Sequence, residues 1–197
     1  MTEVTQNIEK GLKNAYSYVE YEQLIEDLLK EGKSTTKGSD EMFVHYSELG
    51  IQRMKRWDKK FELTEEQTAK VRSYNEKRSW IVLAEGWCGD AAHSVPVMNK
   101  VAELSENIEL KIVLRESNLY LMNDFLTDGG KSIPKLIVYN QEEKEVENTW
   151  GSRPSGAKEI FDANRAGEWE EMEKKLQTWY NKDKGKTTAA ELMELLK

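Results

Sequence analysis

The stretch from Trp87 to Ala91 reads Trp-Cys-Gly-Asp-Ala and holds Cys88, the only cysteine among 197 residues. An apolar run at 80–84 with strand character precedes it, and a helical pattern begins at Gly89. A thiol at such a junction lies beside unpaired helix N–H groups and the positive end of the helix dipole, which favour thiolate over thiol. Asp90 opposes this effect by like-charge repulsion. We therefore expect a modestly depressed pKa for Cys88, below the roughly 8.5 of a free cysteine.

A single thiol restricts the chemistry that this stretch can perform. Cys88 could form a mixed disulfide with a small thiol or a partner cysteine, or be oxidised to a sulfenic acid. A dithiol enzyme needs a second cysteine one helical turn away, where this chain has Ala91. An external thiol would therefore have to complete each turnover.

The two histidines do not extend this chemistry. His93 follows Cys88 by five residues, about 140° around a helix, so we expect it to face away from the sulfur. His45 is expected on the surface. A zinc site would need about four ligands, and one cysteine, two histidines and scattered acids show no ligand spacing. We predict no metal and no cofactor.

Three separate signals give the chain its resemblance to a known family. The Trp-Cys-Gly turn, with Pro96 five residues after Ala91, resembles the active-site turn and kinked helix of the thioredoxin superfamily. Ser132-Ile133-Pro134 resembles the loop in which that family keeps a cis-proline facing the reactive sulfur, and Gly151 matches a third loop. The stretch from Trp87 to Ala91 resembles that of bacterial thioredoxin-family proteins with Trp-Cys-Gly-Asp in place of Trp-Cys-Gly-Pro.

The resemblance implies an α/β thioredoxin-like fold, a central mixed sheet flanked by helices, over residues 79–181. Residues 1–78 would form a helical extension, and residues 182–197 a linker and a short C-terminal helix. The implied roles are attack by Cys88, thiolate stabilisation by the amides of Gly89, Asp90 and Ala91, and substrate binding by Ile133 and Pro134, with Trp87 and Gly151 beside the groove. The peptide before Pro134 should be cis, with its ring against the Cys88 sulfur.

One departure from the family concerns an acid near the nucleophile. The family's buried carboxylate, six residues before the cysteine, falls on Val82 here, so that proton-transfer group is absent. Glu85 is nearer to the site, but at the end of a strand we expect it to be solvated.

The elements that must position these residues follow from hydrophobic periodicity and capping signals. Residues 7–31 predict an amphipathic helix or a helix pair, and Asp40 caps a second helix through Trp57. A capping box begins a third helix at Thr64.

The remaining elements are strands at 79–85, 110–115, 134–139 and 145–150 and helices at 89–105, 119–127, from Ser155, and 168–180. A last helix is expected to begin with a capping box from Thr188 to Glu191. The strand–helix–strand order predicts a right-handed crossover and a parallel pair, followed by an antiparallel half.

Composition limits the partners and the surroundings of the protein. The formal net charge is −7 with both signs interspersed, which opposes binding to nucleic acid or anionic membranes. The first residues carry no basic region and no apolar run, so we predict no signal peptide and a cytoplasmic protein. We expect five tryptophans to serve in the core or in helix packing: Trp57, Trp80, Trp150, Trp169 and Trp179.

Two functions remain open at this stage. The first is thiol–disulfide exchange through Cys88 with protein or low-molecular-weight thiols and disulfides as partners. The second is a redox-inactive thioredoxin-fold module whose groove binds a protein segment. The missing second cysteine and the missing buried acid favour the module, whereas the Trp-Cys-Gly turn and the proline loop favour chemistry. The sequence leaves the substrate and the oligomeric state open.

Overall fold

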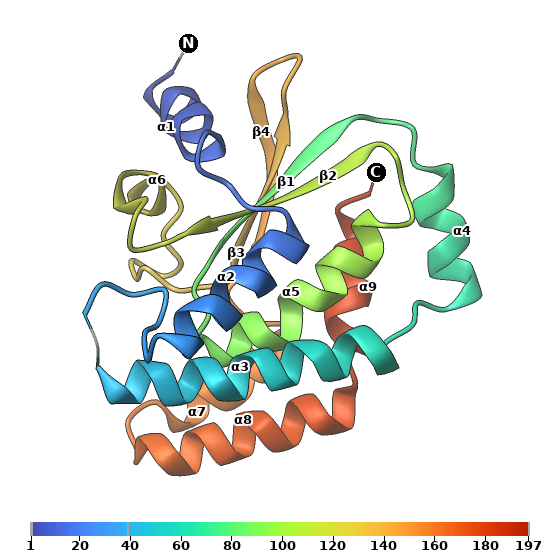
Figure 1. The fold of residues 1–197 in the computed structure, drawn as a ribbon. Helices are drawn as coiled ribbons and strands as arrows, with labels where there is room; N and C mark the ends of the chain where they lie inside the picture. Colours follow the sequence, from blue (N-terminus) through green and yellow to red (C-terminus); the bar gives the residue numbers. More distant parts are fainter. Residues whose placement is uncertain (1, 39, 197) are drawn as a thin grey trace.

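The computed structural model describes residues 2–38 and 40–196. Within them one mixed sheet has the strand order β2-β1-β3-β4. Its strands are β1 (Arg78–Ala84), β2 (Ile108–Leu114), β3 (Lys135–Asn140) and β4 (Glu145–Gly151). β1 pairs with β2 in parallel, while β1–β3 and β3–β4 are antiparallel. The predicted mixed sheet flanked by helices is therefore confirmed (Figure 1).

Helices surround this sheet. They are α1 (Glu3–Leu12), α2 (Tyr18–Lys30), α3 (Glu41–Lys60), α4 (Glu65–Ser73), α5 (Gly89–Ala102), α6 (Leu119–Asp124), α7 (Ser155–Asn164), α8 (Trp169–Asp183) and α9 (Lys186–Glu194). The first predicted segment is a helix pair. The capping box at Thr64 is confirmed, since its hydroxyl accepts from the N–H of Gln67 at 3.2 Å and the Gln67 amide oxygen accepts from the N–H of Thr64 at 3.0 Å.

The predicted capping box of the last helix is wrong. α9 begins at Lys186, after Lys184 and Gly185 adopt left-handed backbone conformations. Glycine reaches this region at little steric cost, so the chain turns between α8 and α9 there. Glu191 instead reaches across the fold, where it accepts hydrogen bonds from Trp150 Nε1 at 2.6 Å and from the N–H of Ser155 at 2.8 Å.

The N-terminal helices are built into the main core. Ile8, Tyr21 and Trp57 belong to the same cluster of buried residues as Trp80 and the apolar side chains of β3. α5 contacts both β2 and α3, and α3 crosses in front of α5 in Figure 1. α3 also approaches the end of β1 closely, because a Cβ at Gly50 would lie 2.4 Å from the carbonyl oxygen of Gly86.

α7 and α8 form a second, smaller apolar layer. Ala157, Met172, Leu176 and Tyr180 make up a separate buried cluster. Figure 1 shows these two helices along the lower edge of the molecule, with α8 beside α3. Tyr46, in the first half of α3, contacts Glu173 of α8, and Arg56, further along α3, contacts Asn181, further along α8. The two helices therefore run in the same direction.

The tryptophans divide between these layers. Trp57, Trp80 and Trp150 are buried in the main core, and Trp179 packs against the α7–α8 cluster. Trp169 was expected in the core or in helix packing, but 57% of its surface is exposed, because it stands at the first residue of α8. None of the described helices is long and apolar enough to cross a lipid bilayer.

Candidate functional site

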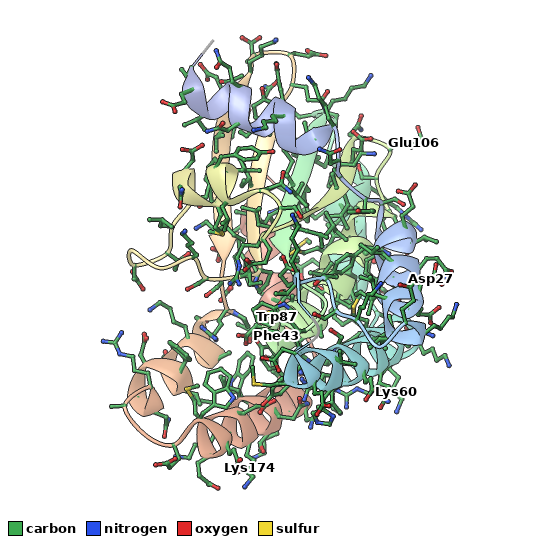
Figure 2. All side chains as sticks on the ribbon, turned by 60° about the vertical axis from the view of Figure 1, so that its left-hand side comes forward. Asp27, Phe43, Lys60, Trp87, Glu106 and Lys174 are labelled. Atoms are coloured by element: carbon green, nitrogen blue, oxygen red, sulfur yellow. The ribbon has the colours of Figure 1, made fainter. Side chains whose placement is uncertain are left out.

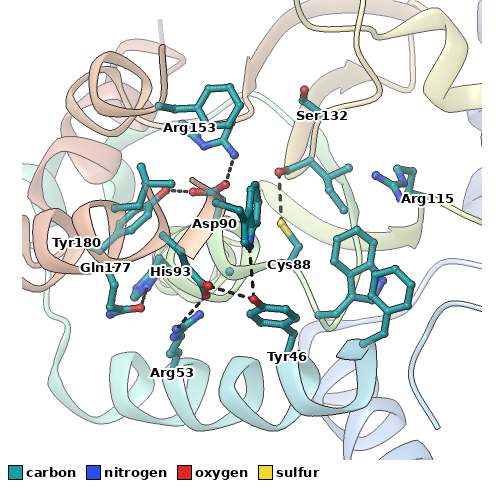
Figure 3. A pocket seen from close by; sticks show the side chains of 18 of the residues that line it. Tyr46, Arg53, Cys88, Asp90, His93, Arg115, Ser132, Arg153, Gln177 and Tyr180 are labelled. Carbon is teal, nitrogen blue, oxygen red and sulfur yellow. Dashed lines mark hydrogen bonds and ion pairs between the residues drawn. The ribbon is translucent and has the colours of Figure 1, made fainter. Parts of the chain in front are cut away.

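Cys88 lies where β1 gives way to α5, at the N-cap position of that helix. Its Sγ donates a hydrogen bond to the carbonyl oxygen of Ile133 at 3.4 Å, and the Ile133–Pro134 peptide is cis. Gly151 packs behind this loop at φ +119°, where a Cβ would lie 2.2 Å from the carbonyl oxygen of Pro134. The fold thus brings the Trp-Cys-Gly turn and the proline loop together, as Figure 3 shows.

The pKa of the Cys88 thiol is raised to about 12, opposite to the depressed value expected from the sequence. Burial is the largest cause, and the neighbouring Asp90 carboxylate adds to it. The backbone N–H groups of Ala91 and Asp90 do lower the pKa by hydrogen bonding to the sulfur. The N-terminus of α5 therefore lowers the pKa of Cys88 as expected, but the desolvation of a buried thiolate raises it by more.

Asp90 has specific partners at the floor of the site. Its side chain is buried, with Oδ2 2.7 Å from Arg153 Nη2, and its Oδ1 accepts a hydrogen bond from the Tyr180 hydroxyl at 2.7 Å. Burial raises the pKa of this carboxyl, and Arg153 and Tyr180 oppose the rise. Asp90 therefore does more than place a carboxylate in the first turn of α5, where the helix dipole favours one, because it also pairs with Arg153 and Tyr180.

Glu85 was expected to be solvated, and that expectation is wrong. Its side chain is fully buried, and it accepts hydrogen bonds from the Thr35 hydroxyl and, at 2.8 Å, from the N–H of Glu116. Burial raises its pKa. Thr35 also accepts from the N–H of Gly86 at 3.1 Å, and Thr36 accepts from Trp87 Nε1 at 2.6 Å. The loop before α3 therefore covers the end of β1 and fixes the turn that carries Cys88.

His93 is buried in a network of its own. Trp57 Nε1 donates to His93 Nδ1 at 2.8 Å, so the neutral ring carries its proton on Nε2, which lies 3.1 Å from Gln177 Oε1. The ring stacks on Tyr180 with centroids 4.1 Å apart. Burial lowers the pKa of His93 to about 3. Within the described residues its hydrogen bonds go to α3 and α8 rather than to Cys88, whereas His45 is exposed as expected.

A cavity of about 740 Å³ opens over this floor. α3, the Trp-Cys-Gly turn, the loop at 131–133, α7 and α8 line it. Five of the predicted site residues lie in its wall, namely Trp87, Cys88, Gly89, Asp90 and Ile133. Ala91, Pro134 and Gly151 do not line the cavity. Phe43 lies against Trp87 with ring centroids 4.9 Å apart, and Figure 2 shows the two side by side.

Residues of α3 and α8 that complete the cavity were not predicted as site residues from the sequence. Tyr46 and Arg53 project from α3, while Trp169, Glu173 and Tyr180 project from α8. Their spacing of four or seven residues was a usable signal, since it places each set on one helix face. Arg53 reaches the turn itself, because a Cβ at Gly89 would lie 3.1 Å from its Nη1. No cluster of three or more metal-ligating side chains occurs in residues 2–38 and 40–196.

Comparisons with known proteins support the same fold. No curated protein matches the chain. The chain is similar to a crystal structure of a Pseudomonas aeruginosa protein of unknown function, PA1234, with a TM-score of 0.58 and 15% identity over 91% of this chain and 96% of that one. It is also similar to an HIV epitope scaffold, with a TM-score of 0.57 and 16% identity over 91% and 96% of the two chains. The family model described as Thioredoxin matches residues 37–184, and the chain therefore belongs to the thioredoxin family.

Proposed function

We propose that this protein is a thioredoxin-fold binding protein that holds a small molecule in the cavity over Cys88 and performs no dithiol exchange of its own. One observation carries the proposal: side chains of α3 and α8 enclose a cavity of about 740 Å³ above a buried thiol. Pockets that take small organic molecules have volumes of about 300–1,000 Å³. A site shaped by two added helix faces suits a compact ligand better than an extended protein segment.

The state of the thiol supports this choice over redox turnover. Burial raises the pKa of Cys88 to about 12, so the thiol stays protonated at neutral pH. Ala91 supplies no resolving thiol, and Val82 supplies no acid within the sheet. Each of the groups that would drive exchange is therefore absent or suppressed.

A second candidate function is monothiol exchange, and one observation favours it. Cys88 faces the cavity, and the N–H groups of Ala91 and Asp90 point at its sulfur. In that reaction the Cys88 thiolate would attack one sulfur of a bound disulfide, and the other sulfur would leave as a thiolate. An external thiol would then break the mixed disulfide and restore Cys88. Its partners would be small or protein thiols in a reducing compartment such as a bacterial cytoplasm.

Alkylation of Cys88 by iodoacetamide across a range of pH separates the two functions. Because the chain has one cysteine, the added mass reports on that residue alone. The binding function predicts a rate that keeps rising above pH about 9, as a strongly raised pKa requires. A plateau with an apparent pKa below about 8.5, together with a mixed disulfide trapped from oxidised glutathione, would establish the second candidate instead.

An Ala91→Cys variant provides an independent test. The i, i+3 spacing at the start of α5 should allow an internal disulfide with Cys88. If the protein is a binding protein, the variant, once dithiothreitol has reduced it to the dithiol, should still fail to accelerate the reduction of insulin by dithiothreitol. Catalysed reduction by this variant would show that the groove supports exchange and that only the second thiol was lacking.

A further inference from the structure

Charge is distributed unevenly around the cavity. Four cationic side chains line it against two carboxylates. On one wall Arg153 pairs with Asp90 at 2.7 Å, and Arg53 lies 4.0 Å from Glu173. Figure 3 shows Arg153 and Arg115 on opposite sides of Cys88. The remaining cations, Arg115 and Lys131, therefore stand together on the other wall.

These two cations retain hydrogen-bonding capacity. Arg115 uses Nε and Nη2 on Glu116 and donates from Nη1 to the carbonyl oxygen of Lys131 at 3.3 Å. A guanidinium has five N–H groups, so two remain for a further acceptor. Within the described part of the chain no carboxylate lies within 4.0 Å of Lys131 Nζ, and Lys131 is exposed at the rim.

The opposite wall holds one further donor, which is buried. Arg153 Nε is buried and has no hydrogen-bond partner among the described residues. A buried donor without a partner is uncommon, since most such groups bond to protein or water. The Arg153 guanidinium also lies 3.9 Å from the ring centroid of Phe161, which keeps it at the cavity wall. This nitrogen has no exposed surface, so the donors that a ligand in the cavity can meet are those of Arg115 and Lys131 on the other wall.

The body of the cavity is aromatic and partly open to water. Phe43 and Trp87 form one face, and the Arg115 guanidinium lies 5.1 Å from the Trp87 ring. Five large hydrophobic side chains are exposed in the described residues, and two of them, Met42 at 51% and Trp169 at 57%, line this cavity. Covering such apolar surface would stabilise a complex by roughly 25 cal/mol per Å² removed from water.

From these observations we infer that the cavity binds a small aromatic or otherwise apolar organic anion. Its apolar body lies against Phe43, Trp87 and Trp169, and its anionic group meets Arg115 and Lys131. This inference rests on the proposed binding function and specifies its ligand class. Because it requires no bond to sulfur, it can be tested with molecules that do not react with Cys88.

Calorimetric titration with three probes of one shape and different charge provides the test. The probes are naphthoate, neutral naphthalenemethanol and cationic naphthylmethylammonium. We expect naphthoate to bind about tenfold or more tightly than the alcohol, a difference of about 1.4 kcal/mol. The cation should bind most weakly, and added salt should reduce the preference for the anion because the Lys131 rim is exposed.

Variants show which side chains cause the preference for naphthoate over the alcohol. Arg115→Gln and Lys131→Gln should each reduce the preference for naphthoate over the alcohol to threefold or less, taking about tenfold as the starting value. Lys144→Gln is the matched control, because Lys144 is an exposed lysine paired with Glu9 and lies outside the cavity wall. Thermal melting of each variant checks that it is folded.

Three results would overturn the inference: equal affinity for naphthoate and the alcohol, an unchanged preference in both cavity variants, or no binding of any probe. Equal affinities would leave the cavity as a binding site and remove only the anion preference. Failure of the binding function itself would be recognised separately, by a reactive Cys88 in the alkylation experiment.

Discussion

The two flanks of Cys88 are built from similar residues in different surroundings. On one flank both carboxylate oxygens of Asp90 have a partner at 2.7 Å, Arg153 or Tyr180, and all three groups lie in or against the floor. On the other flank Arg115 pairs with Glu116, its neighbour in the chain, and Lys131 stands exposed. One flank therefore depends on contacts between distant segments, whereas the other keeps its cations available to the cavity.

This difference has an energetic consequence. A charge taken out of water is stabilised only by its partners, so removing one partner of a buried pair leaves the other charge uncompensated. A pair near the surface exchanges its partner for water and loses little. We expect substitutions on the Asp90 flank to act mainly on folding, and those on the Arg115 flank to act mainly on ligand binding.

The largest effect is expected for Arg153→Met. The variant keeps much of the side-chain volume but leaves Asp90 buried without its cation, which should lower the free energy of unfolding by about 3–5 kcal/mol. Urea unfolding measures the change. The matched control is Lys144→Met, which breaks the exposed pair with Glu9 and should cost less than about 1 kcal/mol.

A double variant tests the cause of this loss. Asp90→Asn added to Arg153→Met removes the stranded charge, so a substantial part of the stability should return. The contact between Arg153 and Phe161 stays lost, and recovery should therefore be incomplete. If Arg153→Met proved no more costly than Lys144→Met, the two flanks would not differ in the way described.

The sheet and the third helix could be predicted from local sequence, whereas the Trp-Cys-Gly turn was predicted from its resemblance to a family motif. β1 and β3 each contain a continuous apolar run, because both strands lie in the interior of the sheet and are covered on both faces. The capping box at Thr64 is a short motif whose conformation depends on neighbours within a few residues. For such features the sequence itself contains the determining contacts.

The electrostatics of the site could not be predicted in this way. Glu85 and Cys88 stand where local rules expect a solvated acid and an activated thiol. Both are buried, Glu85 by the loop that carries Thr35 and Cys88 within the main core. Those contacts join residues far apart in the chain, and desolvation then decides the direction of each pKa shift. Trp169, at the start of the α8 face that lines the cavity, was predicted to serve in the core or in helix packing, and Glu173 and Tyr180 on the same face were not predicted.

The buried flank also predicts a pH dependence through His93. Its folded-state pKa is about 3, whereas an unfolded histidine titrates near 6.5. The stabilising contribution is therefore present above pH about 6.5 and is lost as pH falls toward 3, because only the unfolded chain takes up the proton. Between pH about 8 and about 5 the expected loss is about 2 kcal/mol.

A His93→Phe variant isolates this contribution in urea unfolding at several pH values. It keeps an aromatic ring beside Tyr180 and should flatten the pH profile relative to the wild type, whatever its absolute stability. Comparing the two proteins cancels other groups, among them Glu22, whose pKa burial raises to about 7. His45→Gln, at an exposed site on α3, should leave the profile unchanged. Parallel profiles for wild type and His93→Phe would mean that this flank is open to water.

The smallest stability effect is expected for Arg115→Gln. Its pair with Glu116 joins side chains that are 19% and 30% exposed, and its guanidinium lies 5.1 Å from the Trp87 ring centroid. Such contacts contribute about 0–1 kcal/mol each, so the variant should lose about 1 kcal/mol or less in urea unfolding. Trp87 should keep its place, since Thr36 and Phe43 hold it independently of Arg115. A loss as large as that of Arg153→Met would show that Arg115 supports the Cys88 turn itself. Its N–H groups would then serve the fold, and the contrast between the flanks, with the anion site built on it, would fail.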